Sequence, residues 1–233
     1  MKKLLFLILI SFLLNQRSFA QFNEDPIINL ENEDLKRINF GFFLGFNQYD
    51  YQFDYNENLG DVQVAKTTGF NVGLIAELRL SNHFDLRFEP GLYIAQRNLG
   101  FPNFPSSQPN NFLREVQSTY IHFPLLLKAS TKRLGNFKPF VVGGVSTSIN
   151  LASNEDSVDD NSNGTFRTKT NTFYYEVGFG IDFYLSFFKF SPSIRGVFAI
   201  SDDLVPDADP NSPWTGNINS LYTRGVFVNF TFE

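Results

Sequence analysis

The sequence has 233 residues, a formal net charge of −5, no Cys, and aromatic residues at 17% of its positions. The negative charge provides no basic footprint for nucleic acid, and the absence of Cys excludes a disulfide framework. The length suits a single domain, and no Pro/Ser-rich linker or repeat of solenoid period divides it. The 29 Phe and 9 Tyr residues fit the lipid-facing positions and interface girdles of a membrane barrel.

Residues 1–20 are predicted to be a secretory signal peptide. Two lysines precede the apolar run 4–14, and the small residues Ser18 and Ala20 suit cleavage after residue 20. The run is too short to cross a membrane as a helix. No Cys follows the cleavage site, so a lipid anchor at the mature N-terminus is excluded. Residues 21–38 are expected to be an acidic, disordered extension in the periplasm.

Residues 39–233 read as eight segments in which polar and apolar residues alternate. In the segment 70–80, six apolar residues share one face, whereas Asn71, Glu77 and Arg79 share the other. A membrane barrel places lipid on its apolar face and a polar lumen on the other. The expected strands are 39–50, 68–80, 84–97, 116–129, 137–150, 171–185, 188–200 and 221–232.

The connections between these segments alternate in length. Short connections lie at 81–83, 130–136 and 186–187, and long polar ones lie at 51–67, 98–115, 151–170 and 201–220. Short periplasmic turns and long extracellular loops are typical of outer-membrane barrels. We therefore predict an all-β fold, an eight-stranded antiparallel transmembrane β-barrel in the outer membrane of a Gram-negative bacterium, with both termini periplasmic.

Proline is the feature that fits a closed barrel least well. Pro90, Pro124, Pro139 and Pro192 fall inside expected strands, and a closed barrel has no edge that tolerates a missing donor. Bulges or distorted pairing are expected there. The alternative is a soluble, lipocalin-like barrel, but that fold needs an apolar lumen.

Charged residues on the inward-facing positions contradict an apolar lumen. They are Glu77, Arg79, Arg87, Glu89, His122, Glu176 and Arg195. Eight strands enclose a lumen that side chains just fill, so these residues are expected to form a structural network of ion pairs. A proton or ion path is the functional alternative. Porin activity is not expected.

The sequence supports no catalytic site. His83 lies in a predicted periplasmic turn, and His122 points inward with Ser118 four residues away on the same face. Some small outer-membrane barrels modify lipid A with Ser, His and a carboxylate, but a triad is recognised by geometry and spacing alone is weak. We expect no enzyme activity and no catalytic residue, with His122 held in the charged network.

No metal or cofactor site is expected either. Within the loop 154–164, Asp159-x-Asn161-x-Asn163-Gly164 matches the start of a calcium-binding loop. The twelfth position, which supplies bidentate Glu in such loops, is Thr170. This loop and the segment 207–213 are expected to be acidic, solvated surface loops.

Several strands resemble those of a known family. The segments are FEPGLYI (88–94), TYIHFPLLLK (119–128), FKPFVVGGVS (137–146), YYEVGFGIDF (174–183) and FSPSIRGVF (190–198). They look like the recurring strands of PorT-like outer-membrane barrels, in which the prolines of the third and fourth strands also recur. The resemblance covers nearly the whole mature chain.

The resemblance implies an accessory, non-conducting component of type IX protein secretion and gliding motility. The expected partners are outer-membrane lipid and lipopolysaccharide, together with proteins of the secretion machinery. No nucleic acid or small-molecule substrate is expected. The alternatives are a general adhesion or envelope-integrity barrel and a lipid A-modifying enzyme.

Overall fold

The computed structural model describes residues 28–57, 60–105 and 107–233. The strands are β1 (Ile38–Tyr55), β2 (Gln63–Lys66), β3 (Gly69–Arg79), β4 (Phe84–Phe88), β5 (Gly91–Gly100), β6 (Leu113–Ser130), β7 (Phe137–Asn150), β8 (Asn171–Tyr184), β9 (Lys189–Ala199) and β10 (Ile218–Phe232). The helical elements of these residues are α2 (Pro109–Phe112) and the 3-10 turns η1 (Glu33–Leu35) and η2 (Asn161–Asn163). None of these helices is long and apolar enough to cross a membrane.

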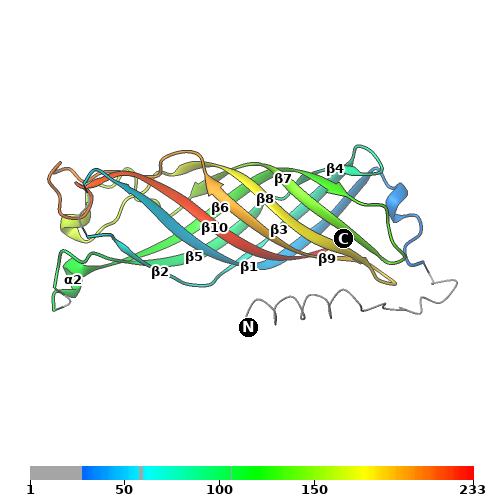
Figure 1. Cartoon of the computed structure of the whole chain (residues 1–233), viewed down its shortest axis with the longest axis horizontal. Helices are drawn as coiled ribbons and strands as arrows, with labels where there is room; N and C mark the ends of the chain where they lie inside the picture. Colours follow the sequence, from blue (N-terminus) through cyan, green and yellow to red (C-terminus); the bar gives the residue numbers. More distant parts are fainter. Residues whose placement is uncertain (1–27, 58–59, 106) are drawn as a thin grey trace, which may run out of the picture.

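The sheet closes on itself. β1 pairs with β10 on one side, where Phe42 lies opposite Phe232, and with β3 on the other, where Phe46 lies opposite Phe70. Around the ring the order is β1-β10-β9-β8-β7-β6, then β4 and β5 end to end, then β3 (Figure 1). β4 and β5 share one position in this ring and β2 lies outside it, so the wall has eight antiparallel strand positions, as predicted. We call these positions staves. β2 is not among the predicted strands, and it pairs with residues 97–100 at the C-terminal end of β5.

Each strand separates apolar and polar residues by alternation. On β8, the outward-facing Val177 and Phe179 are 56% and 60% exposed, whereas the inward-facing Glu176 and Asp182 are 2% and 1% exposed. The same parity runs along the other staves, with a belt of exposed Phe, Leu, Ile and Val on the outer wall. The apolar face is thus the outer face, as a membrane barrel requires.

The prolines do not produce bulges, so that part of the prediction is wrong. Pro124, Pro139 and Pro192 each lie opposite a partner in an unshifted register. The break between β4 and β5 falls at residues 89–90, yet the register with β6 continues across it. Distorted pairing occurs there and beside Pro192, where the β8–β9 ladder stops at Ser193 and resumes at Phe190. The backbone N–H that proline lacks thus leaves a gap in the ladder of hydrogen bonds, but the register of the strands does not shift.

The two ends of the barrel differ. The short-turn rim carries the connections 80–83, 131–136 and 185–188, and the long-loop rim carries 56–68, 101–112, 151–170 and 200–217. Buried apolar side chains gather at the long-loop rim, from both strand ends and loops: Tyr51, Leu99, Phe101, Val116, Phe166, Leu204, Ile218 and Leu221. We call this group the apolar cap. The long loops pack on one another over it, while most residues of the segments 154–164 and 207–213 remain exposed, as expected for surface loops.

The extension that precedes β1 is also ordered from residue 28 onward. Asn29 donates its backbone N–H to Asn136 Oδ1 at 2.9 Å and its side-chain amide to the carbonyl of Tyr184 at 3.0 Å. Arg133 donates back to the carbonyl of Asn29. The expected disorder is therefore wrong for residues 28–37, which lie across the short-turn rim (Figure 1). The predicted signal peptide, residues 1–20, lies outside the described residues.

Substituting a charged residue at the middle of the outer wall tests whether that face contacts lipid. Val177 lies at the centre of β8, and Phe173 lies near its long-loop end, 59% exposed. Val177→Arg is expected to reduce the free energy of unfolding by about 2–4 kcal/mol, and Phe173→Arg by about 0–1 kcal/mol, because the cost falls toward the interface. Urea unfolding from lipid vesicles measures both. Equal costs at the two depths would contradict a lipid-facing wall.

Candidate functional site

A continuous set of ion pairs occupies the lumen toward the short-turn rim. Its members, which we call the lumen cluster, are Glu77, Arg87, Glu89, His122, Lys128, Glu176, Asp182, Lys189, Arg195 and Glu233. All of these side chains are at most 5% exposed. Charges buried so deeply require partners, and each member has at least one.

The shortest contact of the cluster joins opposite walls of the barrel. Arg195 on β9 lies 2.6 Å from Glu89, which sits between β4 and β5. β9 and the β4–β5 stave lie four steps apart in the ring of eight, so this pair crosses the full lumen. Arg195 also contacts Glu176 on β8, with Nε 2.8 Å from Oε2. One guanidinium therefore ties together three staves.

A second branch of the cluster surrounds Glu77 on β3. Lys128 and Lys189 approach its two carboxylate oxygens at 3.2 and 3.3 Å, and Arg87 lies 3.1 Å away. Lys189 in turn lies 2.7 Å from the side chain of Glu233. Removing one partner from such a buried set typically costs 3–5 kcal/mol, because it leaves a charge without compensation. The branch therefore braces the wall from inside.

The structure places the predicted residues unevenly. Six of the seven, all except Arg79, lie in the lumen cluster. Arg79 does not join it, which corrects the prediction. Its guanidinium lies at the short-turn rim and donates to Asn82 Oδ1 at 2.7 Å and to the carbonyl of Ser81 at 3.3 Å. β3 ends at Arg79, so parity is right but the residue sits beyond the lumen.

Four members of the lumen cluster are not among the residues predicted for the network. Lys128, Asp182 and Lys189 have the inward parity that would have identified them. Glu233 follows the last strand, and nothing in the periodicity indicates that its side chain turns into the lumen. Asp182 illustrates what was missed, because it accepts from Lys128 at 2.8 Å and from Ser191 at 2.7 Å.

An aromatic layer covers the lumen cluster on the long-loop side. Phe43, Tyr49, Tyr93, Tyr120, Tyr174 and Phe227 pack there with Ile75 and Val197. His122 lies between the two layers. Its Nε2 is 2.7 Å from Glu176 Oε1, and its ring centroid is 5.2 Å from that of Tyr93 and 5.5 Å from that of Tyr174.

The Ser-His pair considered from the sequence is not formed. Ser118 Oγ accepts from Arg97 at 2.7 Å, and His122 is 0% exposed beneath the aromatic layer. A nucleophile needs a base within hydrogen-bond reach and a path for its substrate. The geometry at His122 provides neither, and it matches a structural role.

Arg97 is a buried cation of a different kind. It is 0% exposed, and its guanidinium carbon lies 4.0 Å from the ring centroid of Tyr51. It donates to the hydroxyl of Tyr120 at 2.6 Å, while its Nε and Nη1 have no hydrogen-bond partner among the described residues. Ring faces and the hydroxyls of Ser118 and Tyr120 surround this charge, and among the described residues no carboxylate is in ion-pair contact with it.

The fragment that resembles a calcium loop is engaged in protein contacts. Asn161 donates its backbone N–H and its side-chain amide to Asp207 Oδ1 at 3.2 and 3.0 Å, and it is 1% exposed. Arg114 donates to the carbonyl of Asn161 at 2.7 Å. The loops 154–164 and 207–213 are thus locked together. In the described part of the chain, no three or more His, Cys, Asp or Glu side chains are grouped to hold a metal ion.

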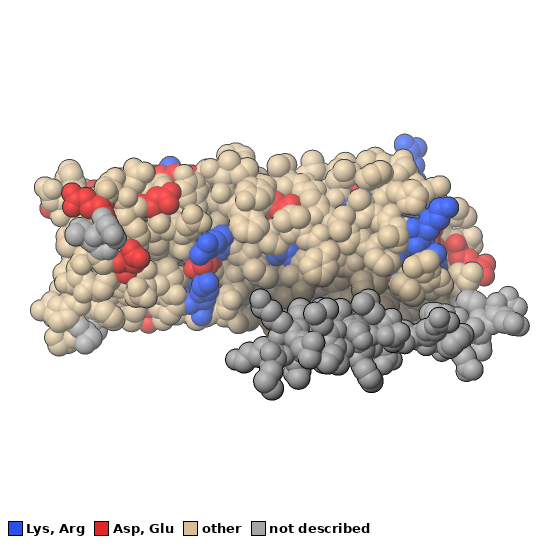
Figure 2. All heavy atoms as spheres, in the orientation of Figure 1, with Lys and Arg blue, Asp and Glu red and all other residues tan. Residues whose placement is uncertain are grey.

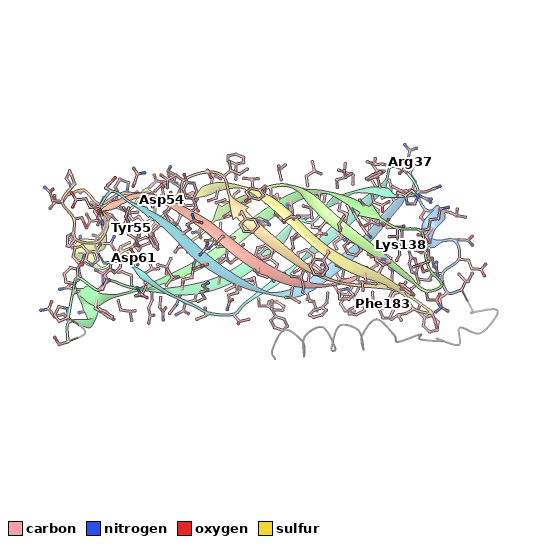
Figure 3. The ribbon with its side chains drawn as sticks, viewed as in Figure 1. Arg37, Asp54, Tyr55, Asp61, Lys138 and Phe183 are labelled. Carbon is pink, nitrogen blue, oxygen red and sulfur yellow. The ribbon has the colours of Figure 1, made fainter. Side chains whose placement is uncertain are left out.

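At the short-turn rim, Asp34 anchors the N-terminal segment. It accepts from Tyr184 Oη at 2.8 Å and lies 3.4 Å from Lys138 and 3.5 Å from Arg133. Figure 3 shows Lys138 at this end of the barrel, together with Arg37. Burial alone would raise the pKa of Asp34, but the hydrogen bond from Tyr184 and the two cations outweigh it and lower the pKa.

Acidification is expected to release this segment. Docking lowers the pKa of Asp34, so the ionised carboxylate stabilises docking at any pH above its ordinary pKa of 3.8. This contribution is lost as the pH falls through the lowered pKa. The chain has no Cys, so a nitroxide label can be attached uniquely through Glu31→Cys. Its electron paramagnetic resonance spectrum should change from that of an immobile label to that of a mobile one as the pH falls below 3.8 and through the lowered pKa.

The matched control is Asp34→Asn in the same labelled chain. It removes the charge and keeps the size, so label mobility should be higher at neutral pH and should no longer depend on pH in this range. A spectrum of the unsubstituted chain that stays unchanged however far the pH is lowered below 3.8, while the barrel remains folded, would contradict the role of Asp34.

Comparison with known proteins finds one matching family and several similar solved structures. The solved structures that resemble this chain include OprG from Pseudomonas aeruginosa, with 14% identity and a TM-score of 0.48 over 83% of this chain and 94% of that one. Neisserial surface protein A has 12% identity and a TM-score of 0.43, over 84% and 98%. No curated protein sequence matches. Residues 19–204 match the family described as "Outer membrane protein beta-barrel domain", and the chain belongs to that family.

Proposed function

We propose that this protein is a non-conducting outer-membrane barrel that acts through protein contacts at its rims, as an accessory component of type IX protein secretion and gliding motility. The observation that carries the first part is the Arg195–Glu89 pair, which bridges opposite walls at 2.6 Å. The assignment to type IX secretion rests on the resemblance of five strands to PorT-like barrels alone.

Three layers support a closed lumen. The lumen cluster, the aromatic layer and the apolar cap follow one another along the axis, and their side chains are nearly all buried. Eight strands leave a width that side chains fill, so neither a folded protein nor a sizeable solute has room to pass. A role in secretion then has to be performed by surfaces.

The rims supply those surfaces. At the long-loop rim, Trp214 stacks on Phe104 with ring centroids 5.1 Å apart and donates its Nε1–H to the carbonyl of Asn111 at 3.0 Å. At the short-turn rim, the N-terminal segment is bound across the mouth by Asp34. Preorganised surfaces lose less conformational entropy when they bind a partner, which favours a docking role.

The proposed orientation places the short turns in the periplasm and the long loops outside the cell, in the outer membrane of a Gram-negative bacterium. This is the usual arrangement of bacterial outer-membrane barrels. Residues 28–37 and the chain's last residue then face the periplasm. Partners at that rim would be proteins of the secretion machinery, while phospholipid and lipopolysaccharide surround the wall.

The second candidate is an adhesion or envelope-integrity barrel. The observation that favours it is the packed long-loop rim, which presents Val158 97% exposed and Leu151 62% exposed beside acidic residues. Exposed apolar side chains on an ordered rim suit contact with another surface. A lipid A-modifying enzyme has less support, because His122 is enclosed between the lumen cluster and the aromatic layer.

A clean deletion of the gene separates the two candidates. The proposal predicts loss of type IX cargo from the medium and loss of surface motility, both restored by the wild-type gene. Cargo is measured by mass spectrometry of the culture supernatant. Normal export and motility in the deletion strain would end the type IX proposal, and altered surface binding or permeability with normal export would support the second candidate.

A further inference from the structure

The outer wall at the short-turn rim contains a groove that no part of the fold described so far uses. It lies between β4, β6 and β7 and is lined by the apolar side chains of Phe84, Ala129, Pro139 and Val141. Phe84 and Val141 are 45% and 56% exposed and belong to the lipid-facing belt. The groove therefore opens toward the membrane, where an acyl chain would lie.

A polar pocket adjoins this groove. The two share His83 and Thr131 as lining residues, so one continues into the other. Four cations line the pocket, Arg79, Lys132, Arg133 and Lys138, together with one carboxylate, Asp34. Figure 2 shows Lys and Arg side chains gathered at this end of the molecule. An apolar groove that ends in a cationic pocket matches a molecule with an acyl chain and an anionic head.

The cations of the pocket differ in how they are engaged. Lys138 and Arg133 pair with Asp34, and Arg133 also lies over the ring of Tyr184, 3.7 Å from its centroid. Arg79, which donates to Asn82 and to the carbonyl of Ser81, and Lys132 have no ion-pair partner within the residues that the structure describes. These two charges are therefore available to a ligand.

His83 lies where the groove meets the pocket. Its Nδ1 is 3.0 Å from the carbonyl oxygen of Ser130, so Nδ1–H is the donor in that contact. Nε2 is left without a hydrogen-bond partner among the described residues. A ligand oxygen at the boundary between the apolar and the charged surfaces would lie beside this ring.

We propose that the groove and the pocket together bind one anionic phospholipid of the leaflet that the short-turn rim faces. The phosphate would lie between Arg79 and Lys132, with His83 below it, and one acyl chain would lie against Phe84, Ala129 and Val141. Basic side chains at a membrane surface attract anionic lipids by about 1 kcal/mol each. The proposal needs only the membrane barrel, so loss of the type IX role would leave it intact.

Native mass spectrometry of the mature chain in detergent micelles tests this binding. Phosphatidylglycerol should remain bound in preference to phosphatidylcholine with the same acyl chains. Arg79→Gln/Lys132→Gln should weaken phosphatidylglycerol binding roughly 30-fold, from two surface cations. The matched control, Lys66→Gln/Lys169→Gln, removes the same charge from the long-loop side and should bind as the unsubstituted chain does.

A third variant tests the apolar half of the site. Ala129→Phe fills the groove without changing the charge of the rim, and it should weaken lipid binding. The variant should still migrate differently on a denaturing gel before and after heating, which shows that the barrel is folded. Equal retention of the two lipids, unchanged binding by the Arg79/Lys132 variant or by Ala129→Phe, or equal competition by free glycerol phosphate would each overturn the proposal.

Discussion

Pairing of charge inside the wall is the constraint on which the rest of this structure depends. The outer face of the barrel contacts lipid, so the charged residues of the strands point into the lumen or lie at the rims. A buried ion is tolerated only beside an ion of opposite charge. Arg195 meets this demand by bridging Glu89 and Glu176, at 2.6 and 2.8 Å. Because these partners belong to separate staves, the ion pairs that satisfy the charges also connect opposite walls across the lumen. A closed lumen follows from the same contacts.

The sequence predicted the parts of this arrangement that depend on a period of two. Alternation placed Glu77, Arg87 and Glu176 inside, and alternating connection lengths gave eight staves. Position along the axis is harder to predict, because the stagger of tilted strands decides which inward residues lie at the same depth. Arg79 shows this, since it has the same parity as Glu77 but lies at the rim, bonded to Asn82. Of the bulges or distorted pairing expected at the prolines, only the distorted pairing occurs, because the neighbouring ladders keep their register, which the sequence does not show.

Neither rim could be predicted from periodicity. The apolar cap draws Phe166 and Leu204 from long loops, where no alternation marks them as buried. The N-terminal segment is acidic, a composition typical of disorder, yet Asp34 finds Lys138, Arg133 and Tyr184 on the rim. Both rims are ordered by contacts between residues far apart in sequence. They are the surfaces on which the proposed protein and lipid contacts depend, because the barrel between them is filled.

Electrical conductance across a planar lipid bilayer tests the central claim, that the lumen cluster and the two apolar layers beside it close the barrel. The protein, inserted and shown to be folded, should give no current steps above the bare membrane. The comparison is the variant Arg195→Ala/Glu89→Ala/Glu176→Ala, which removes the bridge across the lumen. If either protein conducts, it should be this variant. Steady single-channel currents from the unsubstituted protein would contradict the account.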